Sequence, residues 1–218
     1  MSTEKRETIS LEAIDLHDRA HFAELQRQRV LCGWNHSTSA IEAWRDANDA
    51  HTQAMFWVVP TALSTLPIPE RYAGHIAMYK TAFDNQDGID SALPELTAMN
   101  LSTLFILPEH RGKGLASTAV RAIEAMAKIE PYGWPECKVM TLNTLARRYV
   151  EEDEWRAVAE VPYRLEGMEL PPKGTSNEDW YGRMGYVKWK EVEKMYPAKR
   201  EDGSEFWFAA SFMWKELG

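Results

Sequence analysis

Cysteine is scarce in this chain of 218 residues, which contains only Cys32 and Cys137. Two cysteines so far apart build no disulfide framework, and no C-x-x-C pair offers a redox or zinc motif. The first ten residues are polar and lack the apolar core of a signal peptide. We therefore expect two reduced thiols in a cytoplasmic protein.

Long apolar runs and basic clusters are missing as well. No stretch approaches the ~18 consecutive apolar residues of a membrane span. Lys and Arg number 25 against 33 Asp and Glu, so the formal net charge is −8. Proteins that hold nucleic acid through its phosphates usually carry the opposite charge. The sequence predicts neither a membrane nor a nucleic-acid partner, and its acidity suits a cationic amine substrate.

What the chain does contain is enough apolar residues, 44%, for one sizeable domain. We expect a single domain over 1–218, with a polar tail at 1–8. Apolar periodicity predicts a mixed α/β order. The expected strands span 9–16, 55–59, 71–80, 101–107, 139–145, 187–196 and 205–214. The expected helices span 17–34, 38–52, 113–129, 149–163 and 175–184. The last helix has a capping box of Thr175 and Glu178 and a glycine stop at Gly185.

The segment from Leu101 to Ala116, LSTLFILPEHRGKGLA, carries the clearest chemical signal. A strand ends at Pro108, the loop 111–114 follows, and a helix begins inside that loop. A helix N-terminus presents unpaired N–H groups and the positive end of the helix dipole. The two glycines of the loop remove Cβ atoms that would keep a phosphate away from these donors. The segment predicts a diphosphate cradle, flanked by the charges of Arg111 and Lys113.

Two common phosphate motifs do not fit this loop. A P-loop needs G-x-x-x-x-G-K-[ST], but Gly114 follows Lys113, and a dinucleotide fingerprint needs a third glycine where Ser117 stands. The pattern R/Q-x-x-G-x-G/A is satisfied by Arg111 to Ala116. Together with the preceding strand and the Pro-Glu pair at 108–109, this segment resembles the acetyl-CoA motif of the GNAT superfamily of N-acetyltransferases.

A second match lies at Trp180 to Tyr186, WYGRMGY. It is similar to the aromatic-Tyr-x-x-x-Gly-aromatic helix end of the same family, and the resemblance covers about 71–186. Two features depart from the family pattern. Gly174 stands seven residues before Tyr181, where members usually carry an Asn that contacts pantetheine. The insertion at about 146–173 is longer than usual, and it is either a lid over the acceptor site or a surface elaboration.

The resemblance implies a fold and a way of holding the cosubstrate. The fold is a mostly antiparallel seven-stranded sheet with helices on both faces and a splay between the strands 101–107 and 139–145. Pantetheine would pair with the first of these strands, and an N–H near Ile106 or Leu107 would polarise the thioester carbonyl. The loop 111–117 would hold the pyrophosphate. The expected acetyl-CoA-binding residues are Phe105, Ile106, Leu107, Arg111, Gly112, Lys113, Gly114, Leu115, Ala116, Ser117 and Asn143.

The resemblance also implies catalytic roles. Tyr181 would protonate the leaving thiolate, since a tyrosine of ordinary pKa (~10) is a competent acid towards a thiolate. We select Glu95 as the general base, while His75 and relayed water stay open. No metal is expected, because His17 and His21 share a helix face without an H-E-x-x-H pattern or further ligands.

The sequence thus predicts an N-acetyltransferase that moves the acetyl group of acetyl-CoA to the primary amine of a small molecule. The amine would attack the thioester directly. One alternative is a protein or peptide N-acetyltransferase acting on a Lys side chain or an α-amine. The other is a non-catalytic acyl-CoA-binding module, against which the presence of Tyr181 argues. A homodimer is kept open.

Overall fold

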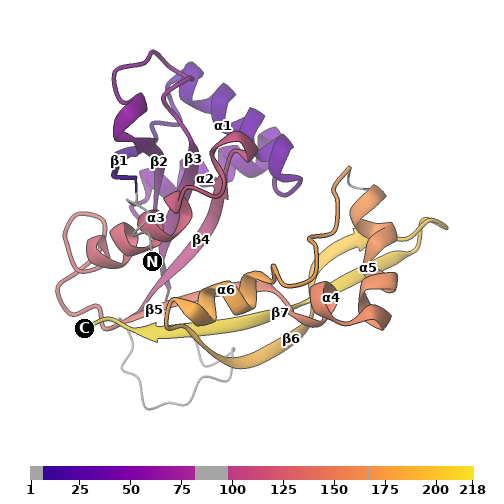
Figure 1. Ribbon diagram of the computed structural model, residues 1–218. Coiled ribbons are helices and arrows are strands. Elements are labelled where there is room, and N and C mark those ends of the chain that lie inside the picture. Colours follow the sequence, from indigo (N-terminus) through magenta and orange to yellow (C-terminus); the bar gives the residue numbers. More distant parts are fainter. Residues whose placement is uncertain (1–6, 82–97, 166) are drawn as a thin grey trace, which may run out of the picture. The chain divides into compact units, whose positions relative to one another are not determined.

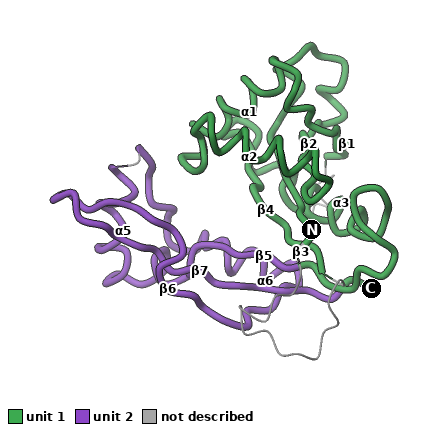
Figure 2. Tube along the Cα trace, turned by 180° about the vertical axis from the view of Figure 1, so that it is seen from behind, with its two compact units in different colours: residues 1–140, 217–218 green, residues 141–216 purple. Residues whose placement is uncertain are grey.

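The computed structural model describes residues 7–81, 98–165 and 167–218. The chain divides into two compact units, formed by 1–140 with 217–218 and by 141–216 (Figure 2). The single domain over 1–218 stays a prediction.

The first unit combines antiparallel strands with three longer helices (Figure 1). Its described strands are β1 (Ile9–Ala13), β2 (Gln53–Pro60), β3 (Gly74–Thr81) and β4 (Ala98–Ile106). Its helices are α1 (Arg19–Cys32), α2 (Thr38–Asp49) and α3 (Leu115–Met126). Short 3-10 turns lie at η1 (Thr61–Leu63) and η3 (Pro108–His110). Neighbouring strands from β1 to β4 pair antiparallel.

The core of this unit is built around β2, which is buried on both faces. Met55, Trp57 and Val59 belong to a buried cluster with Leu25 of α1 and Ile41 of α2. Successive residues of a strand point to opposite faces, so the residues of β2 between these three point to the other face of the sheet. Helix α3 packs against the four strands β1 to β4 of this unit. Helices therefore cover both faces of this part of the sheet.

Helix α1 is two residues shorter at each end than the expected 17–34. The side chain of Asp18 accepts hydrogen bonds from the backbone N–H groups of Ala20 and His21, which starts the helix at Arg19. Gly33, with φ 82°, ends it in the left-handed conformation that glycine adopts most easily.

The second unit contains a long hairpin and the insertion (Figure 1). Its strands are β5 (Val139–Leu145), β6 (Val187–Lys199) and β7 (Glu205–Glu216). Its helices are α4 (Arg148–Glu151), α5 (Asp153–Leu165) and α6 (Asn177–Arg183). The expected single helix over 149–163 is wrong, because extended backbone at Glu152 separates α4 from α5.

The insertion packs onto the hairpin through aromatic rings. The rings of Tyr149 and Tyr163 meet Phe208 of β7 edge-on, with centroids 5.1 and 5.4 Å away. Arg148 forms ion pairs with Glu191 and Glu193 of β6, at 2.8 and 2.6 Å. Edge-on aromatic pairs add to the stability that burial provides. The insertion is thus a packed part of the second unit.

The start of α6 differs from the expected capping box. Ser176, and not Thr175, caps the helix, because its hydroxyl accepts a hydrogen bond from the Asp179 N–H at 3.4 Å. The Thr175 hydroxyl instead donates to the Pro172 carbonyl at 2.6 Å. The stop is confirmed, since Gly185 has φ 94°.

The strand order over the chain is β1-β2-β3-β4-β5-β7-β6. The expected mixed α/β fold with a mostly antiparallel seven-stranded sheet is confirmed. The splay between β4 and β5 stays a prediction.

Candidate functional site

Strand β4 reaches its last residues through a bulge. Ala77 of β3 pairs with Ser102, whereas His75 pairs with Phe105, so β4 holds one extra residue between the two pairs. Thr103, inside this stretch, has a positive φ of 49°. A bulge bends the strand and turns the side chains and amides that follow it. It therefore sets the direction of the residues expected to meet the thioester.

The peptide unit between Ile106 and Leu107 is fixed at both ends. The Leu107 N–H donates to the Ala73 carbonyl at 2.9 Å, and the Ile106 carbonyl accepts a hydrogen bond from Nε of Arg111 at 3.0 Å. Backbone groups alternate in direction along a strand, so the Ile106 N–H points away from β3. Of the two expected donors to the thioester carbonyl, Leu107 is already engaged by β3.

Gly74 allows this close packing of β3 and β4. A Cβ atom at residue 74 would lie 2.1 Å from the Phe105 carbonyl oxygen and 3.0 Å from Cα of Ile106. Both neighbours are backbone atoms, which cannot rotate out of the way. The end of β4 thus depends on a glycine across from it.

The diphosphate cradle is expected at the loop 111–114 and the first turn of α3. Gly112 and Gly114 have φ values of 78° and 75°, which glycine adopts without the strain that other residues pay. Gly114 is the N-cap residue of α3 and no side chain caps the helix. The hydroxyls of Ser117 and Thr118 donate to the Gly114 carbonyl, at 2.8 and 3.1 Å. The amides at this helix start suit an anion such as a diphosphate.

The other expected residues of the loop divide into two kinds. Leu115 is 1% exposed and anchors α3 in the core, so only its backbone can serve a ligand. Arg111 and Lys113 are exposed. The Arg111 guanidinium lies over the ring of Phe105, 5.5 Å from its centroid. The two cations thus differ, because Arg111 is engaged with β4.

His75 is fully buried on β3 and its ring nitrogens face side chains of α1. Nδ1 lies 2.8 Å from Oε1 of Gln28, and Nε2 lies 3.4 Å from a guanidinium nitrogen of Arg29. Burial, and then the positive charge of Arg29, lower the pKa of His75 well below 6.5. This ring packs beside Phe105, with centroids 5.7 Å apart. The arrangement favours a structural role for His75 over a general base.

The other candidate base, Glu95, lies outside the residues that the structure describes. Its assignment, and that of relayed water, stays a prediction.

In the second unit, Tyr181 of α6 is 7% exposed and contacts the rings of Trp180 and Tyr186. Burial, and then the nearby phenol of Tyr196, raise the pKa of Tyr181 above its ordinary value of 10. The hydroxyl is therefore protonated at neutral pH, as a proton donor must be. The raised pKa also makes Tyr181 a weaker acid than the tyrosine of ordinary pKa that the sequence led us to expect.

Asn143, expected to bind the cosubstrate, faces a residue that the sequence did not indicate. The Tyr196 hydroxyl donates to Oδ1 of Asn143 at 2.5 Å. Tyr196 follows an irregularity in β6, where the register shifts between Val192 and Tyr196 and Lys194 has φ 57°. Because a lysine carries no signal for such a bulge, the sequence could not place Tyr196 beside Asn143.

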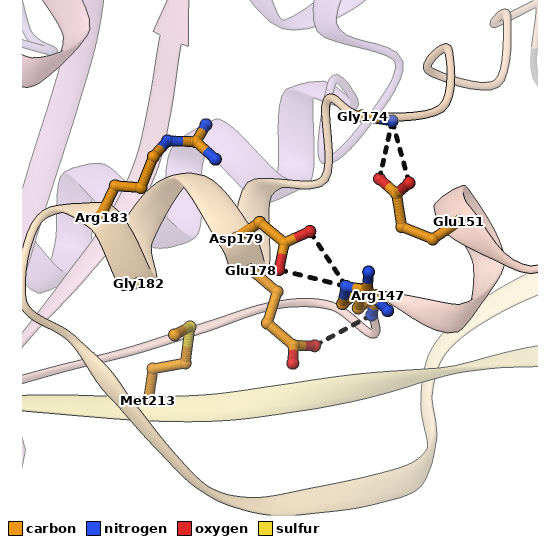
Figure 3. A pocket seen from close by; sticks show the side chains of 8 residues that line it. All are labelled: Arg147, Glu151, Gly174, Glu178, Asp179, Gly182, Arg183 and Met213. Carbon is orange, nitrogen blue, oxygen red and sulfur yellow. Dashed lines mark hydrogen bonds and ion pairs between the residues drawn. The ribbon is translucent and has the colours of Figure 1, made fainter.

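An open hollow of about 680 Å³ lies at the start of α6 (Figure 3). Its lining residues are Arg147, Glu151, Gly174, Glu178, Asp179, Gly182, Arg183 and Met213. The Glu151 carboxylate accepts hydrogen bonds from the backbone N–H groups of Gly174 and Ser176, with distances from 2.9 to 3.2 Å. Nε of Arg147 donates to Asp179 at 3.0 Å, and the Arg147 N–H donates to Glu178 at 2.9 Å. The insertion thus supplies a carboxylate to the backbone around Gly174.

Two kinds of feature are absent from the described residues. None of the helices in 7–81, 98–165 and 167–218 combines the length and apolarity needed to span a bilayer. Over the same ranges, no group of three or more His, Cys, Asp and Glu side chains is placed to hold a metal ion.

A model of the acetyltransferase (GNAT) family matches residues 15–152, which is more than half of the chain. A search of curated proteins gave no match. NAA60 from Arabidopsis thaliana in complex with acetyl-CoA is 15% identical, with a TM-score of 0.59 over 96% of this chain and 99% of that chain. An aminoglycoside 6'-N-acetyltransferase complexed with coenzyme A is 12% identical, with a TM-score of 0.56 over 96% and 97%. A spermidine N-acetyltransferase SpeG chimera from Vibrio cholerae and hSSAT is 11% identical, with a TM-score of 0.55 over 96% and 95%. At these identities the likeness concerns the fold.

Proposed function

Because the chain belongs to the GNAT family of acetyltransferases, we propose that it transfers the acetyl group of acetyl-CoA to the primary amine of a small molecule. The observation that carries this proposal is the loop 111–117. Two glycines in the left-handed conformation lead there into a helix start without a side-chain cap. Such a helix start binds phosphate groups through its backbone amides.

The residues of the first unit fit acetyl-CoA as follows. The amides from Gly112 to Ser117 hold the pyrophosphate, with Lys113 as a nearby positive charge. The edge of β4 at Phe105 and Ile106 pairs with pantetheine, and Gly74 keeps that edge in place. Acetyl-CoA supplies an activated acetyl group, which an amine takes by direct attack on the thioester carbonyl.

Three roles fall to the protein during transfer. The Ile106 N–H stabilises negative charge on the thioester oxygen, the task of an oxyanion donor. Tyr181 gives its hydroxyl proton to the sulfur as the C–S bond breaks. A base, for which we keep Glu95 and relayed water, takes the proton that the attacking amine loses.

The acceptor class rests on charge. The net charge of −8 favours amines that arrive as cations. A second candidate acceptor is the Lys side chain or α-amine of a peptide, since proteins of similar fold include both small-molecule and protein N-terminal acetyltransferases. A cytoplasmic location and a homodimer belong to the same proposal and are not needed for the chemistry.

A panel of acceptors tests this function. With acetyl-CoA saturating, thiol release is measured with polyamines, aminoglycosides, aryl-alkylamines and peptides that carry free α-amines or lysines. We expect the highest kcat/KM among the small amines. Turnover with peptides and not with small amines would show that the acceptor is a peptide amine and not a small molecule. Tight CoA binding without turnover on any acceptor would support an acyl-CoA-binding module.

A further inference from the structure

We propose that Arg111 is a positioning residue: it fixes the end of β4 so that the Ile106 N–H is aligned as the oxyanion donor. Its positive charge contributes less to the reaction than this alignment does. The inference rests on the proposed function and concerns the same site. It departs from the expectation that Arg111 acts as a counter-charge for phosphate.

The geometry of Arg111 joins the loop to the strand. Its Nε donates to the Ile106 carbonyl at 3.0 Å, and its guanidinium lies over the Phe105 ring at 5.5 Å. Its own backbone N–H donates to the Pro108 carbonyl at 3.2 Å, which closes the turn between strand and loop. The side chain therefore spans the turn and returns to the strand that the turn leaves.

This hydrogen bond completes the fixation of one peptide unit. The N–H of the peptide between Ile106 and Leu107 is held by Ala73, and its carbonyl is held by Arg111. With both ends engaged, this peptide plane is held on one side of the Ile106 Cα, and the pairing of His75 with Phe105 holds the plane that carries the Ile106 N–H on the other side. Arg111 thus limits the rotation at Ile106 that would turn its N–H. A donor that is already aligned stabilises a developing oxyanion without reorganisation during the reaction.

Lys113 provides the contrast within the same loop. It is exposed, and within the described ranges it forms no hydrogen bond or ion pair with another residue. A lysine acts as a point charge, whereas arginine offers donors in fixed directions. The loop thus divides two tasks between its cations, with charge from Lys113 and alignment from Arg111.

Two substitutions at residue 111 separate alignment from charge. In arginine the Nε follows three methylene groups, and in glutamine the amide nitrogen Nε2 stands the same number of bonds from Cα. Arg111→Gln thus removes the charge but keeps an N–H donor that can reach the Ile106 carbonyl. Arg111→Lys keeps the charge but places a methylene group where the donor was.

The experiment measures three quantities for wild type, R111Q, R111K and the loop control Lys113→Met. They are the Kd of CoA, kcat with saturating acetyl-CoA, and the infrared stretch of a ¹³C-labelled thioester carbonyl in bound acetyl-CoA. We expect kcat to fall at least tenfold in R111K and less in R111Q. The carbonyl stretch should move towards its value in free acetyl-CoA in R111K, and stay near the wild-type value in R111Q and in Lys113→Met. Lys113→Met should weaken CoA binding.

An equal or reversed order of R111Q and R111K, in kcat and in the carbonyl stretch, would overturn the proposal and return Arg111 to the role of a counter-charge. Thermal melting shows whether each variant is folded, and a variant is compared only if it is. If wild type binds no CoA, the proposed function itself fails, a result that the control measurement reveals before any variant is made.

Discussion

The amide oxygen of Gln28 lies 2.8 Å from Nδ1 of His75, and both side chains are completely buried. The amide nitrogen of Gln28 donates to Glu24 at 2.8 Å, which orients its oxygen towards the histidine. Nδ1 therefore carries the proton, and Nε2, facing Arg29, is the unprotonated nitrogen. This neutral ring packs beside Phe105, so its protonation state is linked to the stability of the strand that bears the site.

We predict that the protein loses stability below pH 6.5 because of His75. Its pKa is lowered in the folded state, so below 6.5 the unfolded chain binds a proton that the folded chain does not. The free energy of unfolding then falls by up to about 1.4 kcal/mol per pH unit for this group. Urea unfolding at pH 7.5, 6.5 and 5.5 measures this change in the free energy of unfolding.

His75→Gln should be less stable than wild type throughout, but with a flatter dependence on pH. The exposed His36 offers a matched control, and His36→Gln should keep the wild-type slope. Parallel curves for wild type and His75→Gln would show that His75 does not titrate as described.

Gly114→Val should weaken CoA binding by more than tenfold, about 1.4 kcal/mol. A valine at this helix start brings methyl groups to the place where a phosphate approaches the amides. A valine in this left-handed conformation also lowers the free energy of unfolding, by about 1–2 kcal/mol. Calorimetric titration with CoA gives the affinity.

Gly203→Val separates the two effects. Gly203 has φ 80° in an exposed turn, and a Cβ there would meet no atom within 4 Å. We expect a similar loss of stability with unchanged CoA affinity. If both variants bind CoA like wild type, the cradle does not lie at residue 114.

The acidic surface predicts a salt effect on the acceptor. With acetyl-CoA saturating, kcat/KM for a cationic amine should fall as ionic strength rises, because screening shortens the attraction to ~8 Å at physiological salt. An amine that is mostly neutral at the assay pH should respond less. Equal responses of the two amines would remove electrostatic steering from the account.

The elements that could be predicted from the sequence are those with strong local signals. Strand β5 covers 139–145 as expected, and the proline and glycines before α3 place its start within two residues, at Leu115 and not at the expected residue 113. These residues restrict the backbone whatever surrounds them. For this reason the sequence was sufficient to predict the loop 111–117 as the expected place for the pyrophosphate of acetyl-CoA.

The remaining contacts depend on packing between distant segments. The bond between Tyr196 and Asn143 joins residues 53 positions apart and depends on the positive φ of Lys194. The break at Glu152 and the Glu151 carboxylate at Gly174 follow from the way the insertion packs. Periodicity describes single elements, and it carries no information on which of them meet.

The pH dependence of kcat tests the protonation state of Tyr181, the proposed general acid. Because burial raises the pKa of Tyr181 above 10, its deprotonation should produce no fall in kcat below about pH 10. A profile of kcat from pH 6 to 10, at saturating concentrations of both substrates, measures this. A loss of kcat centred well below pH 10 that disappears in Tyr181→Phe would contradict the raised pKa.

The central claim, that this chain catalyses transfer with Tyr181 as the acid, is tested most directly by the kcat of Tyr181→Phe. The change keeps the ring and its packing and removes only the proton donor, which matters as the C–S bond breaks. We predict a folded variant that binds acetyl-CoA like wild type, with kcat lower by about 10²–10⁴. A folded variant with the kcat of wild type would contradict the claim.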